Sequence, residues 1–231
     1  MASENAAIRF SRGMDVSGRK LVVFDFDGTL SDTVRGITST ARTVLHDHGL
    51  SDDEIGDLRR IVGPPFPMAF TLVYGFSKEE AAQITEEYRA IYRTLGPEAF
   101  PAIPGTVELA DSLHAAGKVL GVASSKRSSL LERGMRDSGL APHFDIYLGK
   151  IDDDVDTKPQ TIRRVMERTG LEPQDAVMVG DRFYDVDAAT EVGIPCVGVH
   201  YVHTREVKEL VDAGAVAVAE TVDELGRILL G

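Results

Sequence analysis

The chain has 231 residues, of which 43% are hydrophobic, enough to bury the core of one α/β domain that carries an inserted subdomain. Its formal charge of −12 would repel another polyanion, so the composition argues against a nucleic acid polymer as a partner. The single cysteine, Cys196, excludes an intrachain disulfide and fits a reducing compartment, for which we expect the cytoplasm. Because no run approaches the ~20 apolar residues of a membrane span, we expect no membrane partner, and we expect a monomer or a homodimer.

The first predicted element, after a polar N-terminal tail of residues 1–19, is a buried strand. Residues 20–25 form a short apolar run with β-branched and aromatic side chains, which is typical of a strand buried on both faces. Similar runs follow at residues 119–124, 145–148, 176–180, 195–199 and 216–219. Because helical patterns lie between most of these runs, the sequence predicts an α/β fold with a doubly wound parallel sheet, that is, a Rossmann-like core.

The alternation of strands and helices is interrupted once, by helices without a convincing strand. An apolar stripe over residues 34–45 predicts one helix, for which Ser31 or Asp32 is a candidate N-cap. The segment that begins at Ser77 has the form of a capping box and predicts a second helix that runs to about Leu95.

These helices are predicted to form an inserted cap. Between them, residues 63–67 include three prolines and a glycine, which cannot form regular helix. We therefore expect a helical cap over residues 31–100 and a catalytic core formed by residues 20–30 and 101–231.

Acidic side chains gather where two of the predicted strands end. Strand alternation turns Asp25 and Asp27 to the same side, and Gly28 permits a sharp turn or a close approach to a ligand. Asp181 and Asp185 follow another strand and lie near the start of a predicted helix. Carboxylates at a buried strand end are costly without a cation or a shared proton, so this pattern favours a functional site.

Hydroxyl groups and cations lie at other strand and helix ends. The second predicted strand ends with Ser124, Ser125 and Lys126 and leads into a helix, whose first amide groups favour an anion. Lys158 opens a later helix, with a proline in the first turn. In open parallel sheets ligands bind beyond the carboxyl ends of the strands, which is where these groups would meet.

This arrangement resembles a known superfamily. The segment Asp25–Leu30, Ser124, Lys158 and the pair Asp181 and Asp185 resemble, in that order, the four motifs of the haloacid dehalogenase superfamily. The helical insertion resembles the small α-helical cap of that superfamily. Within it, the chain is most similar to the phosphoglycolate phosphatase and 5′-nucleotidase-like branch.

The resemblance implies a Mg²⁺-dependent phosphatase that acts on a small phosphorylated metabolite through an aspartyl-phosphate. It implies that Mg²⁺ is held by two carboxylates and by the main-chain carbonyl of Asp27. It implies that Asp25 is the nucleophile and that Asp27 transfers the proton, while the phosphate is bound by Ser124, Ser125, Lys158 and Gly28. The implied metal-binding residues are Asp25, Asp27 and Asp181, and Asp185 and Thr29 would support the site. The cap residues that would contact the leaving group are Gly63, Pro64, Pro65 and Phe66.

Several alternatives stay open at this point. The substrate could be phosphoglycolate, a nucleoside monophosphate or a sugar phosphate, and a phosphomutase could use the same four motifs. A receiver-like phospho-switch is disfavoured because its fold has no helical insertion of this size. A metabolite-binding protein with an inactive site is disfavoured because all the chemical groups are present.

Overall fold

The computed structural model describes residues 14–152, 155–202 and 206–231, so residues 1–13 of the predicted tail lie outside the described part. Its core is a six-stranded parallel sheet in the order β3-β2-β1-β4-β5-β6. The strands are β1 (Leu21–Phe24), β2 (Val119–Arg127), β3 (Ile146–Lys150), β4 (Ala176–Gly180), β5 (Cys196–Val199) and β6 (Ala217–Ala219). The predicted α/β fold with a doubly wound parallel sheet is confirmed.

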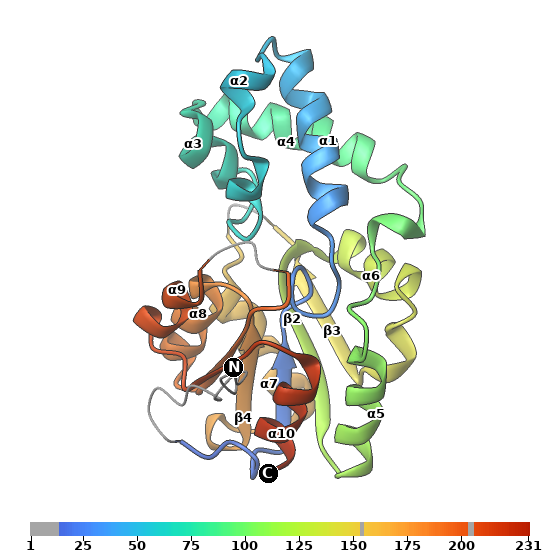
Figure 1. Cartoon of the computed structure of the whole chain (residues 1–231), viewed down its shortest axis with the longest axis vertical. Coiled ribbons are helices and arrows are strands. Elements are labelled where there is room, and N and C mark those ends of the chain that lie inside the picture. The colour runs from blue at the N-terminus through green and yellow to red at the C-terminus, as the bar shows by residue number, and fades with distance from the viewer. Residues whose placement is uncertain (1–13, 153–154, 203–205) are drawn as a thin grey trace, which may run out of the picture.

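Helices cover both faces of this sheet (Figure 1). One face carries α7 (Lys158–Thr169), α8 (Phe183–Val192) and α9 (Val207–Ala213), and the other carries α5 (Thr106–Ala115), α6 (Ser128–Asp137) and α10 (Val222–Leu230). Leu21 and Val23 pack toward the first group of helices, whereas Val22 and Phe24 pack toward the second. All four side chains are buried, which explains why the strand reads as a continuous apolar run.

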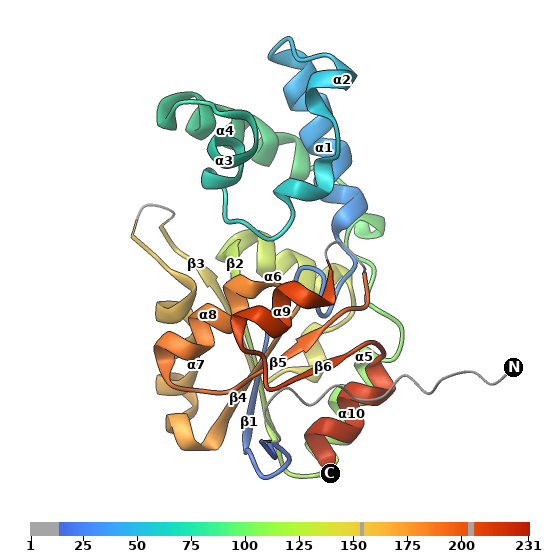
Figure 2. The same ribbon diagram turned by 60° about the vertical axis from the view of Figure 1, so that its left-hand side comes forward.

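The insertion between β1 and β2 consists of helices and stands over one end of the sheet (Figure 2). Its elements are α1 (Val34–Asp47), α2 (Asp52–Ile55), α3 (Met68–Tyr74), α4 (Lys78–Tyr92) and two short 3-10 helices at Leu58–Ile61 and Pro97–Ala99. The two chain segments that join it to the core lie side by side, since Ser31 Oγ donates to the Pro101 carbonyl at 3.0 Å and the Asp32 amide donates to the same oxygen at 2.9 Å. We keep the name cap for residues 31–100, a boundary that remains a prediction.

The ends of the cap helices differ in part from the sequence prediction. The capping box of α4 is confirmed, because the Glu80 amide donates to Ser77 Oγ at 3.2 Å and Glu80 Oε2 accepts from the Ser77 amide at 2.9 Å. Helix α4 ends at Tyr92, before the predicted Leu95. Helix α1 begins at Val34 after Thr33, and the candidate N-cap Ser31 instead bonds to the returning chain.

Strand β2 is longer than predicted. The apolar run predicted a strand over residues 119–124, with Ser125 and Lys126 at its end, but β2 continues through a register shift to Arg127, which pairs with Lys150 of β3. The sequence pattern failed here because Ser124, Ser125 and Arg127 line an internal pocket, so their polarity does not mark exit into solvent. Ser124 therefore lies inside a strand and not at its end.

We predict that Ser77→Ala lowers the free energy of unfolding by about 1 kcal/mol, because it removes the side-chain acceptor at the start of α4. For a chain of this size the melting temperature should fall by about 2–4 °C, measured by circular dichroism. Ser112→Ala is the control, since Ser112 is exposed within α5 and alanine is favoured there. Equal losses in the two variants would contradict the capping role.

Candidate active site

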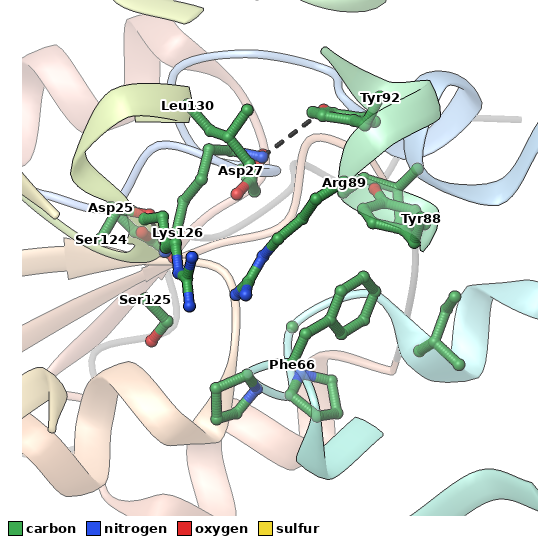
Figure 3. A pocket seen from close by; sticks show the side chains of 16 residues that line it. Asp25, Asp27, Phe66, Tyr88, Arg89, Tyr92, Ser124, Ser125, Lys126 and Leu130 are labelled. Atoms are coloured by element: carbon green, nitrogen blue, oxygen red, sulfur yellow. Dashed lines mark hydrogen bonds and ion pairs between the residues drawn. The ribbon is translucent and has the colours of Figure 1, made fainter. Parts of the chain in front are cut away.

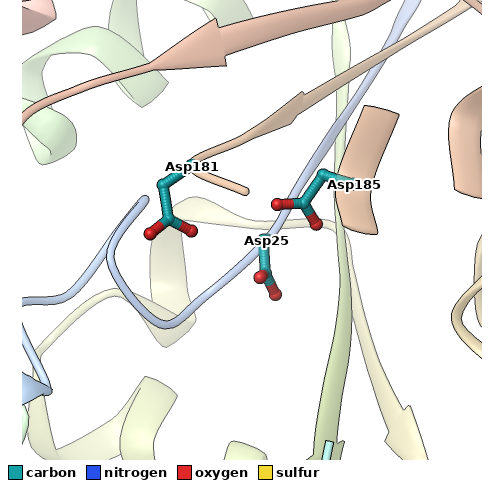
Figure 4. Close-up of side chains that lie close together, drawn as sticks. All are labelled: Asp25, Asp181 and Asp185. Carbon is teal, nitrogen blue, oxygen red and sulfur yellow. The ribbon is translucent and has the colours of Figure 1, made fainter. Parts of the chain in front are cut away.

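The candidate site forms where β1 and β4 lie side by side at the centre of the sheet. The chain continues from β1 to β2 on one side and from β4 to β5 on the other, so this pair is the topological switch point. Asp25 follows β1 directly and Asp181 follows β4. Asp185 lies in the first turn of α8, whose direction brings its carboxylate back toward the other two. One oxygen from each carboxylate lies within 4.8 Å of the others (Figure 4).

One ammonium group stands against this cluster. Lys158, the first residue of α7, forms an ion pair with Asp25 Oδ2 at 2.8 Å and a second one with Asp185. Lys158, Asp25 and Asp185 are all buried, so these charges are little screened by water. With three carboxylates and one ammonium, the buried cluster holds an excess of negative charge.

The excess negative charge appears in the pKa values of the cluster. Burial raises the pKa of Asp25 to about 6, against the opposing effect of Lys158. Burial and the neighbouring Asp185 and Asp25 raise the pKa of Asp181 well above its usual range. Burial by itself would lower the pKa of Lys158, but the carboxylates of Asp185 and Asp25 outweigh it and raise that pKa.

The carboxylate cluster fits a hard divalent cation. Asp181 Oδ1 is buried and has no hydrogen-bond partner, which is costly unless a ligand completes it. Carboxylate oxygens are the ligands that Mg²⁺ prefers. The turn at Gly28 lies so close that a Cβ atom there would overlap the Asp181 carboxylate, and Gly28 has a φ of +78°. The sequence therefore needs glycine here for both space and backbone conformation.

Asp27 lies beside the cluster but its side chain has other partners. Thr33 Oγ1 donates to Asp27 Oδ1 at 2.6 Å, and Lys126 Nζ lies 3.1 Å from the same oxygen. Lys126 also donates to the hydroxyl of Tyr92 at 3.4 Å and stands over that ring at 4.8 Å (Figure 3). Sequence reasoning noted Lys126 as a cation but assigned it no role. The signal was its position two residues after Ser124, on the same face of the strand.

A pocket opens between the cap and this end of the sheet. Core residues Asp25, Asp27, Ser124, Ser125, Lys126 and Arg127 line it from one side, and the cap supplies Gly63, Pro64, Pro65, Phe66, Tyr88, Arg89 and Tyr92 from the other. The predicted cap loop thus lies opposite the predicted phosphate-binding serines. Figure 3 shows Arg89 reaching from α4 toward Ser125.

Arg89 and Arg127 were not singled out from the sequence. Arg89 is only 5% exposed although it is an arginine, and it shares the buried face of α4 with Thr85, Tyr88 and Tyr92. An arginine on the apolar stripe of a helix was therefore the missed signal. Arg127 was missed because the strand was predicted to end before it.

The remaining predicted residues take different places. Ser124 is buried and its Oγ accepts from the Lys126 amide at 3.3 Å, while Ser125 is half-buried in the pocket wall. The Gly28 amide donates to the Ser31 carbonyl at 2.8 Å, so in this structure it closes the turn. Thr29 Oγ1 is buried without a hydrogen-bond partner. The predicted phosphate-binding role of Gly28 and supporting role of Thr29 stay predictions.

Comparison with known proteins agrees with this geometry. A model of the haloacid dehalogenase-like hydrolase family matches residues 22–199, which is most of the chain. The chain belongs to this family. A predicted phosphatase of known structure from Clostridium acetobutylicum superimposes with a TM-score of 0.86 at 33% identity, covering 92% of this chain and 98% of the other.

The relatives of this chain are named for more than one activity. A 5′-nucleotidase from Pseudomonas aeruginosa is 32% identical over 78% of this chain and 82% of its own length. A phosphoglycolate phosphatase from Rhodospirillum rubrum is 30% identical over 90% and 89%. A protein named tyrosine-protein kinase PtkA from Mycobacterium tuberculosis is 36% identical over 91% and 72%. The family and its phosphatase-named relatives show that the chain is a phosphatase.

Within residues 14–152, 155–202 and 206–231, no helix is long and apolar enough to cross a membrane.

We predict that Mg²⁺ stabilises the fold by relieving the excess negative charge of the cluster. At about ten times its dissociation constant, Mg²⁺ should raise the melting temperature by about 3–6 °C relative to EDTA. Asp181→Asn should abolish this shift and, in EDTA, should be at least as stable as the wild type, because it removes a buried carboxyl whose ionisation is costly.

Asp47→Asn serves as the control for this measurement, since Asp47 is exposed at the end of α1. It should keep the full shift. An equal Mg²⁺ shift in Asp181→Asn would mean that the cation binds elsewhere.

Proposed function

We propose that this phosphatase is a Mg²⁺-dependent phosphomonoester hydrolase that acts on a small phosphorylated metabolite through an aspartyl-phosphate. The observation that carries the proposal is the position of Asp25. Its carboxylate is buried at the end of β1, is held by Lys158 at 2.8 Å, and lines the pocket together with Asp27 and Ser124. A buried carboxylate with a cation and a hydroxyl group around one point supports the assignment of Asp25 as the nucleophile.

The cluster of Asp25, Asp181 and Asp185 provides the carboxylates for Mg²⁺, of which we assign Asp25 and Asp181 as ligands, with the Asp27 main-chain carbonyl as the third. Asp185 is assigned to orient Lys158, with which it forms an ion pair. When bound, Mg²⁺ would neutralise the charge of the phosphate and of the attacking carboxylate, which otherwise repel each other.

In the first step a carboxylate oxygen of Asp25 attacks phosphorus, and the bond from phosphorus to the leaving oxygen breaks. Asp27 gives its proton to that oxygen, so the leaving group departs as an alcohol. Lys158 and the Ser124 hydroxyl would hold the phosphoryl oxygens. In the second step Asp27 takes a proton from a water that attacks phosphorus, the bond from Asp25 to phosphorus breaks, and inorganic phosphate leaves.

The cations of the pocket favour a leaving group that carries its own negative charge. Arg89 and Arg127 both line the pocket, one from the cap and one from the core. Glu86 Oε1 accepts from Arg89 at 2.7 Å and lies 3.7 Å from Arg127, so one carboxylate brings the two guanidinium groups together. In a chain of charge −12, such a concentration of cations fits an anionic group and is unneeded for a neutral one.

We therefore propose a phosphoglycolate-like substrate, with a phosphate and a carboxylate on a short carbon chain. A nucleoside monophosphate or a sugar phosphate is the alternative, and the aromatic rings of Phe66 and Tyr88 in the pocket wall would suit the former. A small-metabolite substrate, the cytoplasm as compartment, and a monomer or homodimer without nucleic acid or membrane partners remain predictions.

We predict that Asp25→Asn lowers phosphate release by a factor of about 10³ or more on every ester, because the nucleophile is lost. Asp27→Asn should slow alkyl phosphates by about 10²- to 10⁴-fold and an aryl phosphate by less, since a phenolate leaves without a proton. Asp32→Asn, at an exposed neighbouring acid, is the control. The measurement is phosphate release with Mg²⁺ and with EDTA.

The same assay, run on a panel of phosphoglycolate, nucleoside monophosphates, sugar phosphates and an aryl phosphate, separates the competing reactions. Turnover of Asp25→Asn at the wild-type rate would contradict the nucleophile assignment. Isomerised sugar phosphate in place of free phosphate would indicate a phosphomutase, and transfer from ATP to a tyrosine peptide would indicate the activity in the name of the mycobacterial relative.

We predict that Arg89→Met lowers kcat/KM for phosphoglycolate by about 10- to 100-fold, because a charge-assisted hydrogen bond is lost. For 2-hydroxyethyl phosphate, which has a neutral hydroxyl in place of the carboxylate, the fall should be only a few-fold. Arg136→Met on the exposed side of α6 is the matched control. Equal losses on both substrates would show that Arg89 has a structural role only.

A further inference from the structure

The backbone of Arg182 contacts the carboxylate cluster. It follows Asp181 directly and is the N-cap residue of α8. Its amide donates to Asp185 Oδ2 at 3.0 Å, a bond that holds the first turn of the helix and orients the carboxylate that pairs with Lys158. A change in the position of Arg182 would therefore also change the positions of Asp185 and Lys158, which lie beside the nucleophile.

The side chain of Arg182 leaves the core and reaches the cap. Its Nη1 donates to the main-chain carbonyl of Val62, 120 residues earlier in the chain, and Arg182 is only 4% exposed. Gly63 has a φ of +105°, and a Cβ atom there would overlap the guanidinium group of Arg182. The glycine thus provides the close approach between the cap backbone and a core side chain.

Glu209, on α9, holds the guanidinium group in place. Its Oε1 accepts from Arg182 Nε at 2.8 Å and from the Phe183 amide at 3.3 Å. The same carboxylate therefore fixes both the arginine side chain and the first turn of α8. Because the arginine is held on its core side, its Nη1 offers a fixed hydrogen-bond donor to the cap.

The docking point lies immediately before the loop that lines the pocket. Val62 is 1% exposed, and the next residues, Gly63 to Phe66, form the pocket wall opposite Ser124 and Ser125. A loop with two consecutive prolines has few internal hydrogen bonds of its own, so its position depends on its anchors. Arg182 anchors its first end to the helix that carries Asp185.

We propose that Arg182 is a positioning residue that fixes the cap loop Gly63–Phe66 over the phosphate site and thereby sets substrate preference. The proposal rests on the proposed phosphatase reaction for its kinetic consequences. Arg182 itself touches neither the nucleophile nor the reacting phosphate. Its side chain anchors the loop at the Val62 carbonyl. Its amide donates to Asp185, which pairs with Lys158, so the position of the loop is coupled to the orientation of Lys158.

The first test is independent of activity. Limited proteolysis of the full chain with thermolysin, which cleaves before apolar residues, should show cleavage within residues 61–70 at least about five times faster in Arg182→Met than in the wild type, as analysed by mass spectrometry. Arg133→Met is the matched control, because Arg133 is another core arginine that bonds to the cap, at the carbonyls of Arg93 and Leu95. An equal rise in cleavage of the loop in both variants would reduce the effect to general loosening of the cap and overturn the proposal.

The second test is kinetic. Arg182→Met should raise KM for the best substrate of the ester panel by about tenfold and flatten the ranking of esters, while the Mg²⁺ concentration that gives half of the thermal shift stays within about twofold. Arg182→Lys should restore part of the ranking, since it keeps a donor. Unchanged KM and ranking in Arg182→Met would overturn the proposal.

A second variant, made from the cap side, covers the case in which Arg182→Met folds poorly. Gly63→Ala places a methyl group against Arg182 from the cap side and should give the same loss of ranking. If both variants act on one contact, the loss of ranking in the double variant Gly63→Ala/Arg182→Met should be no larger than the larger loss in the two single variants. Additive losses would contradict a shared contact. If the wild type hydrolyses no ester, the proposed reaction fails, and the proteolysis result still decides the anchoring.

Discussion

The structure depends on the burial of three carboxylates against one ammonium group at the switch point of the sheet. Asp25, Asp181 and Asp185 bring more negative charge into the interior than Lys158 can balance. Such charge is costly in a low-dielectric interior, and it persists only where further cations or ligands complete it. The space that this cluster occupies restricts two nearby positions to glycine. A Cβ atom at Gly28 would overlap the Asp181 carboxylate, and one at Gly180 would overlap that of Asp185.

The order of the strands follows from the same constraint. Asp25 and Asp181 come close only because β1 and β4 are neighbours, although they are far apart in the chain. Their neighbourhood requires the chain to build one half of the sheet, return to the centre and build the other half. The pairing of β1 with β4 is therefore what makes the four separate sequence motifs one site.

The cap and the core each supply part of the site. The core holds the acids and Lys158, while the cap adds Arg89, aromatic rings and the loop Gly63–Phe66. The core side also provides cations that contact the cap. Lys126 stands over Tyr92, Arg127 lies near Glu86, and Arg133 and Arg182 donate to main-chain carbonyls of the cap. The cap thus contacts the core through directional polar bonds as well as through one cluster of buried apolar side chains that runs through both.

The sequence by itself determined the features that depend on local pattern. The apolar run of β1, the turn glycine Gly28 and the capping box at Ser77 follow from periodicity and turn chemistry within a few residues. The order of the motif residues along the chain was sufficient to show the resemblance to a known superfamily. Tertiary structure decided the rest, because it depends on contacts between distant segments. β2 continues to Arg127 since its polar residues face a pocket that only the cap creates. Arg182 meets Val62 across 120 residues, and no local pattern encodes where an inserted cap will place a carbonyl oxygen.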